Sequence, residues 1–302
     1  MSLSSSPLVS VVTLTWNTTS ITCDFLRSIN AQSNYSNLEI IIVDNGSKED
    51  PTEAFMAIRP DVKVIRNDRN LGFTGGNNIG ISAAKGDYLF IVNNDTEFTP
   101  GLIEGLIEVF QHYPDAGMVS PKFHYYFHKG IIEYAGYNLV NPFTGRNSMV
   151  GCREKDNGQY EEIRVTNYAH GGGMMVPKKV IDEVGMLPDE FFIYYEELDW
   201  SEQIKRAGYK IYYQPRSLIY HKESMTTGKE SPFKAFYHTR NRILFMIRNM
   251  NFFQRSVFLL YFSLFTVPKN TLKFIFNKQF QHLKSFWKGI LWHFNNEITF
   301  NH

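Results

Sequence analysis

The segment of residues 90–96 constrains the fold more than any other part of this 302-residue chain. A short apolar run, typical of the end of a buried strand, stops abruptly at Asn93, Asn94 and Asp95. In an open α/β sheet, ligands bind beyond the carboxyl ends of the strands. A carboxylate at that position can hold Mg²⁺ or Mn²⁺ together with substrate phosphates. Asn and Asp are also ordinary turn residues, so this segment alone leaves a plain strand-end turn open.

Three further segments place polar or glycine residues at the end of apolar runs, namely residues 9–17, 38–47 and 70–80. The candidate ligand-contacting residues in them are Thr15, Asn17, Asp44, Gly75, Gly76 and Asn77. Glycines let a backbone approach a ligand closely, and the amides at a helix N-terminus suit phosphate. The glycine-rich stretch matches neither the dinucleotide fingerprint nor the P-loop, which disfavours dehydrogenases and P-loop NTPases.

Alternating strands and helices predict βαβ units and a mostly parallel sheet. The predicted strands lie near residues 9–15, 38–43, 62–65 and 88–92, and the predicted helices near 20–32, 52–58, 76–85 and 100–113. Residues 123–168 are irregular and are expected to form loops and short hairpin strands over the sheet, where an acceptor could bind. A helix over residues 196–207 is expected to end at Gly208.

The order of these motifs resembles the glycosyltransferase family 2 pattern on the GT-A fold, most closely its bacterial rhamnosyltransferase-like branch. The resemblance covers roughly residues 8–245 and continues through residues 191–200, 206–209 and 219–221. It implies an α/β GT-A domain at residues 8–235 with a mostly parallel central sheet. It also implies inverting transfer of a sugar from a UDP- or dTDP-linked donor, with dTDP-rhamnose as one candidate, to a glycan or lipid-linked glycan.

The resemblance also implies roles for individual residues. Asp95 and His221 would hold Mn²⁺ or Mg²⁺ with the donor diphosphate, and Asp44 would accept a hydrogen bond from a pyrimidine N3–H. Thr15 and Asn17 would border the base. Asn93 and Asn94 would reach the ribose or the phosphates.

An acidic cluster formed by Glu196, Glu197 and Asp199 is the candidate catalytic group. Sugar transfer to a hydroxyl needs a carboxylate that removes the acceptor proton. The resemblance matches Glu196 and Glu197 to a Glu-Asp pair whose second acid is the base, so Glu197 stands where Asp is usual. Asp199 remains an alternative base. A purely structural alternative is an acidic first turn that complements the helix dipole.

The C-terminal segment, residues 236–302, differs from the rest of the chain in charge and composition. It holds nine Lys or Arg, one acid and 17 of the 46 aromatic residues, although the whole chain carries a net charge of only +1. Its longest uncharged run is shorter than the ~20 residues that a spanning helix needs. We therefore expect a basic helical segment at the cytoplasmic face of a bacterial plasma membrane, contacting anionic lipid without crossing it. Packing on the body or on a second subunit of a homodimer is the alternative.

Other functional classes receive less support from the sequence. The C-terminal segment contains no recognised nucleic-acid-binding motif. The two cysteines of the chain, Cys23 and Cys152, do not have the spacing of metal ligands. A sugar-1-phosphate nucleotidyltransferase should carry a basic glycine-rich loop after the first strand, where residues 16–20 have none. A non-catalytic sugar-nucleotide-binding protein is disfavoured because Asp95 and the acidic cluster are present. No secretory signal peptide is expected from the short polar start of the chain.

Overall fold

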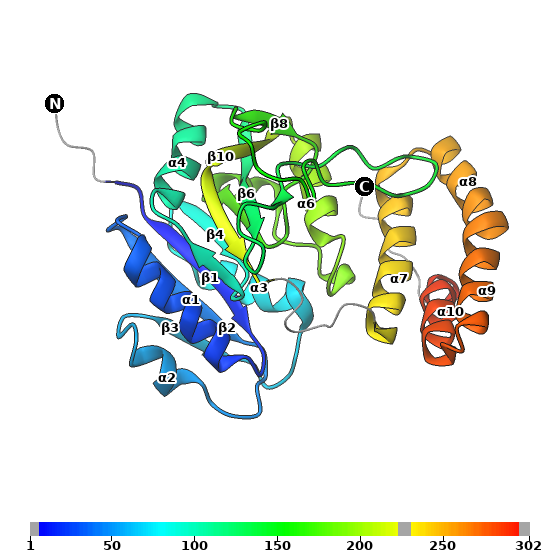
Figure 1. Cartoon of the computed structure of the whole chain (residues 1–302), viewed down its shortest axis with the longest axis horizontal. Coiled ribbons are helices and arrows are strands. Elements are labelled where there is room, and N and C mark those ends of the chain that lie inside the picture. The colour runs from blue at the N-terminus through cyan, green and yellow to red at the C-terminus, as the bar shows by residue number, and fades with distance from the viewer. Residues whose placement is uncertain (1–5, 223–230, 296–302) are drawn as a thin grey trace.

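A computed structural model describes residues 6–222 and 231–295 as an α/β protein with a ten-stranded sheet and a group of C-terminal helices (Figure 1). The strands are β1 Val9–Thr15, β2 Leu38–Asp44, β3 Lys63–Arg66, β4 Tyr88–Val92, β5 Thr96–Phe98, β6 Ala116–Tyr125, β7 Ile132–Tyr134, β8 Arg164–Thr166, β9 Gly173–Pro177 and β10 Lys210–His221. The helices of the α/β body are α1 Thr19–Gln32, α2 Thr52–Met56, α3 Gly72–Ala83, α4 Leu102–His112, α5 Lys178–Val184, a 3-10 turn at Asp189–Phe191 and α6 Glu196–Arg206. The predicted α/β class is thereby confirmed.

The sheet has a parallel half and a mixed half, with the strand order β3-β2-β1-β4-β9-β6-β10-β5. The first four strands are parallel to their neighbours, whereas β9 runs antiparallel to both β4 and β6. The long strands β6 and β10 pair in parallel, with a register shift between Gln214 and Leu218. Each contains a proline, Pro121 or Pro215, which hides its length in the sequence because proline is rare inside sheets.

Helix α3 packs unusually close to the parallel strands, and this explains its glycines. It begins at Gly72, four residues before the predicted start. Gly72 has a φ of +77°, and a Cβ there would lie 2.5 Å from the Phe192 carbonyl oxygen. A Cβ on Gly80 would lie 2.4 Å from a Val12 methyl group. The glycines therefore allow the helix to approach both β1 and the segment that follows Phe191.

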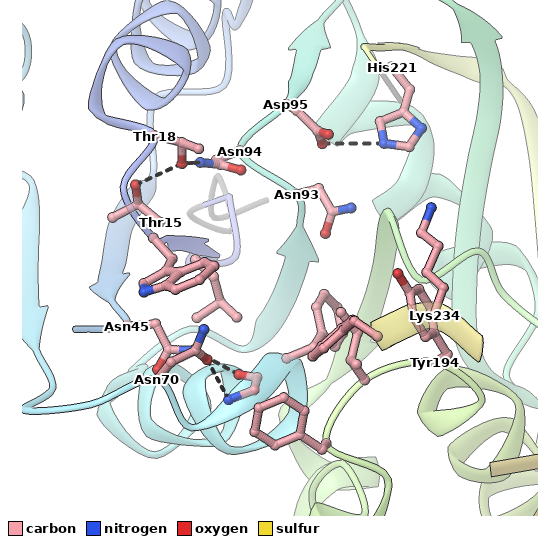
Figure 2. A pocket seen from close by; sticks show the side chains of 17 residues that line it. Thr15, Thr18, Asn45, Asn70, Asn93, Asn94, Asp95, Tyr194, His221 and Lys234 are labelled. Atoms are coloured by element: carbon pink, nitrogen blue, oxygen red, sulfur yellow. Dashed lines mark hydrogen bonds and ion pairs between the residues drawn. The ribbon is translucent and has the colours of Figure 1, made fainter. Parts of the chain in front are cut away.

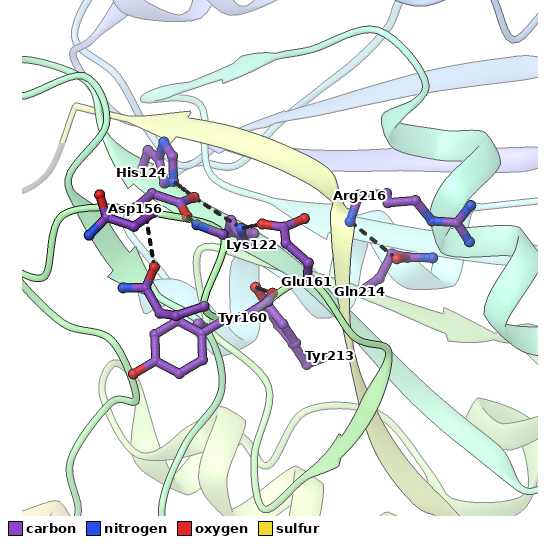
Figure 3. A network of polar contacts seen from close by, with 12 residues as sticks. Lys122, His124, Asp156, Tyr160, Glu161, Tyr213, Gln214 and Arg216 are labelled. Carbon is purple, nitrogen blue, oxygen red and sulfur yellow. Dashed lines mark hydrogen bonds and ion pairs between the residues drawn. The ribbon is translucent and has the colours of Figure 1, made fainter.

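The irregular residues between β7 and β8 are fastened to the sheet by a buried polar network (Figure 3). Lys122 of β6 is 3% exposed, and its ammonium group lies 3.0 Å from Asp156 and in close contact with Glu161. His124 Nε2 lies 2.8 Å from the same Asp156 carboxylate. Buried charges need such partners, so the network fixes the path of these residues across the sheet.

The C-terminal helices lie at one side of the sheet, with α7 between the α/β body and the others (Figure 1). They are α7 Pro232–Asn249, α8 Phe252–Tyr261, a π-helical turn Phe262–Thr266, α9 Val267–Phe276 and α10 Phe280–Asn295. A hydrophobic cluster that includes Phe191, Phe245, Phe258 and Phe286 joins them to the body. The predicted boundary between residues 235 and 236 falls inside α7, and the two-part division stays a prediction. In the described residues, no helix is long and apolar enough to cross a membrane.

Candidate active site

A cavity of about 300 Å³ lies beyond the carboxyl ends of β1, β2 and β4 (Figure 2). Its walls come from strand ends, from the start of α3, from the segment before α6 and from the start of α7. The lining residues are Leu14, Thr15, Trp16, Thr18, Asn45, Asn70, Gly72, Phe73, Asn93, Asn94, Asp95, Phe192, Ile193, Tyr194, His221, Phe233 and Lys234. The structure thus brings together five of the predicted site residues: Thr15, Asn93, Asn94, Asp95 and His221.

Asp95 and His221 meet because strands β5 and β10 pair side by side. His221 lies opposite Thr96 in the antiparallel ladder, and the Lys222 amide donates a hydrogen bond to the Asp95 carbonyl oxygen. His221 Nε2 lies 3.2 Å from Asp95 Oδ1, and Figure 2 shows the two side chains facing each other. This is an ion-pair distance without hydrogen-bond geometry, since Oδ1 is buried and accepts no hydrogen bond.

A third residue, Glu133 of β7, orients the histidine from the opposite side. Both of its carboxylate oxygens lie 2.9 Å from His221 Nδ1, and Glu133 is 4% exposed. Burial lowers the pKa of His221, but the contacts with Asp95 and Glu133 outweigh it and raise the pKa to about 10. The two carboxylates therefore favour the protonated form of His221.

The pair of Asp95 and His221 has the chemistry of half of a metal site. A metal-binding histidine commonly donates its second ring N–H to a carboxylate, as His221 does to Glu133. Asp95 Oδ1, which accepts no hydrogen bond, faces His221 Nε2. A cation bound between these two atoms would replace the proton on Nε2. Among the described residues, no group of three or more His, Cys, Asp or Glu forms a complete ligand set. The remaining ligands would therefore be diphosphate oxygens and water, as is usual for Mg²⁺.

Side-chain amides form a rigid polar wall on the opposite side of the cavity. Asn94 donates to the hydroxyls of Thr18 at 3.0 Å and Thr22 at 2.8 Å, which ties the end of β4 to α1. Asn45 donates to Asn70 Oδ1 at 3.0 Å and to the Gly72 carbonyl at 2.9 Å. These bonds fix the directions of the polar groups before any ligand binds.

Several predicted donor-contacting residues lie behind this wall and do not line the cavity. Asp44 is completely buried; its oxygens accept hydrogen bonds from the Ser47 amide and from Arg66, so no free oxygen faces a base. Asn17 accepts a hydrogen bond from the Lys48 amide and holds the loop after β2. Gly76 packs against Leu14 and Asn45.

Gly75 and Asn77 of α3 also lie outside the lining of the cavity. Gly75 borders a different, shallow depression on the outer side of the helix. Asn77 is 1% exposed and donates a hydrogen bond to the Phe73 carbonyl. The start of α3 reaches the cavity through Gly72 and Phe73 instead, about one helical turn before the predicted residues.

The segment before α6 forms one side of the cavity in a strained conformation. Phe192, Tyr194 and Tyr195 all have positive φ angles, between 64° and 73°. Such angles are costly for residues with large side chains and persist where the surroundings hold them. Here Asn241 of α7 supplies that support, because its amide group donates to the carbonyls of residues 191, 193 and 194 at 2.7–3.0 Å.

The acidic cluster lies at the start of α6, adjacent to this segment but outside the cavity lining. Glu196 and Glu197 each have one buried carboxylate oxygen without a hydrogen bond. Burial raises the pKa of Glu197 to about 7 and that of Glu196 well above its usual range. A Cβ placed on Gly171 would lie 3.6 Å from the Glu197 carboxyl carbon, and the next residue, Gly172, accepts a hydrogen bond from the Asn93 amide. Gly171 and Gly172 therefore lie between Glu197 and Asn93, which lines the cavity.

Asp199 is held by α7 and is not available in the same way. It is completely buried, and its oxygens accept hydrogen bonds from Asn249 at 2.6 Å, Arg248 at 3.1 Å and Gln203 at 2.8 Å. These partners give it a role in attaching α7 to α6. Of the acids in the cluster, Glu197 has the pKa that suits a general base near neutral pH.

Five parts of the site were not predicted from the sequence, namely Glu133, Asn45, Asn70, Lys234 and the segment 192–194. Asn45 and Asn70 lie in the segments 38–47 and 70–80, so they could have been proposed from the sequence. Glu133 had no local signal, because it contacts His221 across 88 residues of sequence.

Comparison with known proteins places the chain in a defined group. The model described as "Glycosyl transferase family 2" matches residues 10–185. "Uncharacterized protein y4gI" of Sinorhizobium fredii is 27% identical over 259 residues, covering 80% of this chain and 27% of that longer relative. "N-acetylglucosaminyl-diphospho-decaprenol L-rhamnosyltransferase" of Mycobacterium tuberculosis H37Rv is 21% identical, covering 69% of this chain and 74% of the relative.

Among solved structures, GalNAc-T7 with UDP, GalNAc and Mn²⁺ superposes with a TM-score of 0.61 at 19% identity. The superposition covers 75% of this chain and 45% of that one. At this identity the likeness concerns the fold, and it confirms the predicted GT-A architecture.

Proposed function

Because the chain belongs to glycosyl transferase family 2, we propose that it transfers a sugar from a nucleotide-diphospho-sugar to a hydroxyl group with inversion. The observation that carries this proposal is the convergence of Asp95 and His221 in a cavity at the carboxyl ends of parallel strands, with Glu133 holding the histidine from behind. A nucleotidyl transfer reaction and a non-catalytic binding function gain no support from the family match.

The donor would lie along the cavity with its base near β1 and its diphosphate near Asp95. Trp16, which is 41% exposed at the cavity wall, offers a flat apolar surface for a base. The amides of Asn45 and Asn70 are suited to polar edges of the base or ribose, and Asn93 and Asn94 lie closer to Asp95. We propose a UDP- or dTDP-linked donor, with dTDP-rhamnose as a candidate.

Asp95 and His221 would hold a divalent cation, Mn²⁺ or Mg²⁺, with Glu133 keeping the histidine in place. The cation would stabilise the negative charge of the departing nucleoside diphosphate. Metal binding requires His221 to lose the proton that Asp95 and Glu133 favour, so metal affinity should rise with pH.

Glu197 would be the general base. Its carboxylate would take the proton of the acceptor hydroxyl while that oxygen bonds to the sugar C1 and the C1–O bond to the diphosphate breaks. A pKa of about 7 leaves a substantial fraction of Glu197 ionised at neutral pH. Glu196, which is also buried without a full set of partners, has its pKa raised by burial and by the neighbouring Glu197.

The acceptor would be a glycan or polyprenol-linked glycan at the cytoplasmic face of a bacterial plasma membrane. The outer faces of the C-terminal helices support this, because they expose apolar side chains together with lysines. On α10 the exposed residues recur at helical spacing: Phe280, Lys284, Trp287, Leu291 and Phe294. Such a stripe suits the boundary between lipid headgroups and acyl chains.

A thermal-shift screen of nucleotide-sugars, with and without Mn²⁺ or Mg²⁺, tests the proposal. A donor raises the melting temperature by mass action, and we expect the rise only when a divalent cation is present. UDP-, dTDP- and GDP-linked sugars should be compared with the free sugars as controls. If no nucleotide-sugar stabilises the protein with either metal, the proposed function is wrong.

A further inference from the structure

A second cavity, of about 440 Å³, lies between α7 and the helices α8–α10. Its lining residues are Arg146, Tyr195, Ser231, Lys234, Ala235, His238, Thr239, Arg242, Phe262, Thr266, Asn270, Lys273, Phe274, His282 and Phe286. The ionisable residues among them include four Lys or Arg and two His, but no Asp or Glu. A cavity with this lining has the electrostatic character of an anion site.

Three of the positive charges around this cavity have no acidic partner within residues 6–222 and 231–295. Arg146, Arg242 and Lys273 form no ion pair there. Arg242 is 9% exposed and donates to the Thr144 carbonyl. Burial lowers the pKa of Arg242, and the positive charge of Arg146 lowers it further, which shows that the two cations repel each other. A bound anion would remove this repulsion.

One polar group in the cavity is left without a hydrogen bond among the described residues, the buried Nε2 atom of His282. A second histidine, His238, is kept uncharged, because burial lowers its pKa to about 4 and the charge of Lys234 acts in the same direction. An oxyanion in the cavity would give His282 a partner.

The second cavity adjoins the candidate active site, since the two share one lining residue and have neighbouring ones. Lys234 lines both cavities. Tyr194 lines the first and Tyr195 the second, and His238 of the second stacks on Tyr194 with ring centroids 4.3 Å apart. A ligand whose anionic group occupies the second cavity can therefore extend a neighbouring group toward the first.

The other side of the second cavity is apolar. Phe262, Phe274 and Phe286 form part of its wall. The helices that carry them expose Leu264 at 59% and Phe276 at 79% on their outer surfaces. An occupant with an apolar chain next to its anionic group would match both kinds of wall.

We infer that the second cavity binds the phosphate groups of an acceptor carried on an apolar chain, such as a polyprenyl diphosphate, and presents its sugar to the first cavity. This inference rests on the proposed glycosyltransferase function and assigns the acceptor class and its binding residues. Arg146, Arg242, Lys234 and Lys273 would contact the phosphates, and the helices α8–α10 would accept the start of the chain.

Calorimetric binding of farnesyl diphosphate, inorganic pyrophosphate and farnesol tests the inference. The full chain should bind farnesyl diphosphate more tightly than either of the other two, because only this probe offers both parts. The double variant Arg146→Ala/Lys273→Ala, whose residues lie exposed at the cavity mouth, should bind it about 10-fold or more weakly. Lys288→Ala, an exposed lysine of α10 outside the cavity, is the matched control and should bind it normally.

Donor binding in the same samples separates this inference from the proposed function. UDP or dTDP with Mn²⁺ should bind the double variant and the wild type equally, because the first cavity is unchanged. Nucleotide binding without farnesyl diphosphate binding would overturn the inference alone, whereas failure of the nucleotide would overturn the proposed function. Pyrophosphate binding as tight as that of farnesyl diphosphate would identify a free phosphate compound as the occupant. Binding to phosphatidylglycerol vesicles provides a further comparison. If Lys288→Ala and the double variant lose vesicle binding equally, and both bind farnesyl diphosphate like the wild type, the basic residues bind lipid headgroups. Both results would overturn the inference.

Discussion

The parallel half of the sheet and the C-terminal helices place their apolar residues in opposite environments. In β1, β2 and β4 the apolar residues are nearly all buried, and Thr15, Asn45 and Asn93, at or just after the ends of these strands, line the first cavity. In α8–α10 many large apolar residues are exposed, and Arg242 of α7 and Lys273 of α9 line the second cavity. The first region is therefore suited to a polar ligand held by a rigid scaffold, whereas the second exposes an apolar surface.

Helix α7 connects these two regions. Asn241 holds the segment that lines the first cavity, while the next residue, Arg242, lines the second. Two consecutive residues of α7 therefore contribute to different cavities. The comparison predicts that changes in the strand-end site abolish donor binding or chemistry, while changes on the outer helices leave both intact.

The largest effect is expected for Asp95→Ala. This change removes the carboxylate that would hold the cation and leaves His221 without one of its two acidic neighbours. Mn²⁺-dependent donor binding should fall below detection in calorimetry, a loss of at least about 100-fold. Asp68→Ala, at an exposed acid of the same domain, is the control. Unchanged donor affinity and metal dependence in Asp95→Ala would remove this residue from the site.

Glu197→Gln should preserve donor binding but lower turnover by about 10²–10⁴-fold, because proton removal is lost while the shape is kept. Asp199→Asn should do the reverse. It breaks a buried ion pair with Arg248 and should lower the free energy of unfolding by about 2–4 kcal/mol, with turnover largely kept below the melting temperature. Steady-state kinetics measures the turnover of both variants, and urea unfolding measures their free energy of unfolding. The opposite pattern would make Asp199 the base.

The raised pKa of Glu197 predicts a pH dependence in both activity and stability. Activity should rise with pH through about 7, because the base must be ionised. The folded protein retains a proton that an unfolded Glu releases near pH 4.3, so this contribution to stability is complete below that pH and is lost as the pH rises through about 7. Glu197→Gln should therefore melt at a higher temperature than the wild type at pH 8, but not at pH 4. A lower melting temperature of the variant at pH 8 would contradict the burial argument.

These predictions concern residues that differ in how far the sequence could identify them. The ends of β1, β2 and β4 were predictable because buried parallel strands are short apolar runs, and Asp95 and His221 came from motifs. Asp44 and Gly76 carried the same motif signal but serve packing behind the wall. A sequence motif indicates which residue type stands at a position. Whether that side chain faces the cavity or the core depends on the fold.

The remaining site residues depend on contacts that no local pattern reveals. Glu133 reaches His221 from a three-residue strand, and Asn241 holds carbonyls about 50 residues earlier in the chain. The acids of the cluster could be proposed as a group, but their separate roles depend on partners. Asp199 meets Arg248 and Asn249, whereas Glu197 has an oxygen without any.

Asn241→Ala tests the connection between the two regions, with an intermediate effect. Losing three hydrogen bonds to a strained segment should weaken donor binding about 10-fold and lower the free energy of unfolding by about 1–3 kcal/mol. Asn270→Ala is the control, because the Asn270 side chain donates a hydrogen bond to the Thr266 carbonyl four residues earlier and does not contact the segment 191–194. Calorimetry with UDP or dTDP and Mn²⁺ measures the first effect. Normal donor affinity in Asn241→Ala would show that the segment keeps its shape without support from α7.

The smallest effect on the isolated protein is expected on the outer face of α10. The triple variant Phe280→Gln/Leu291→Gln/Phe294→Gln changes side chains that are 63%, 50% and 79% exposed, so the core and the first cavity should not be affected. Donor binding should remain within about twofold of the wild type, since surface substitutions usually change stability by no more than about 0.5 kcal/mol. Flotation with phosphatidylglycerol vesicles should fall sharply, because the apolar insertion is lost and each remaining lysine contributes only about 1 kcal/mol at low salt.

Phe127→Gln, at an exposed phenylalanine of the α/β body, provides the matched control for this last measurement. It removes a comparable apolar surface far along the chain from the helices and should leave flotation unchanged. If the wild type does not float at low or high salt, the exposed stripe does not bind anionic lipid. Packing against a second copy of the chain then becomes the better explanation, and a concentration-dependent change in mass that the triple variant abolishes would identify it.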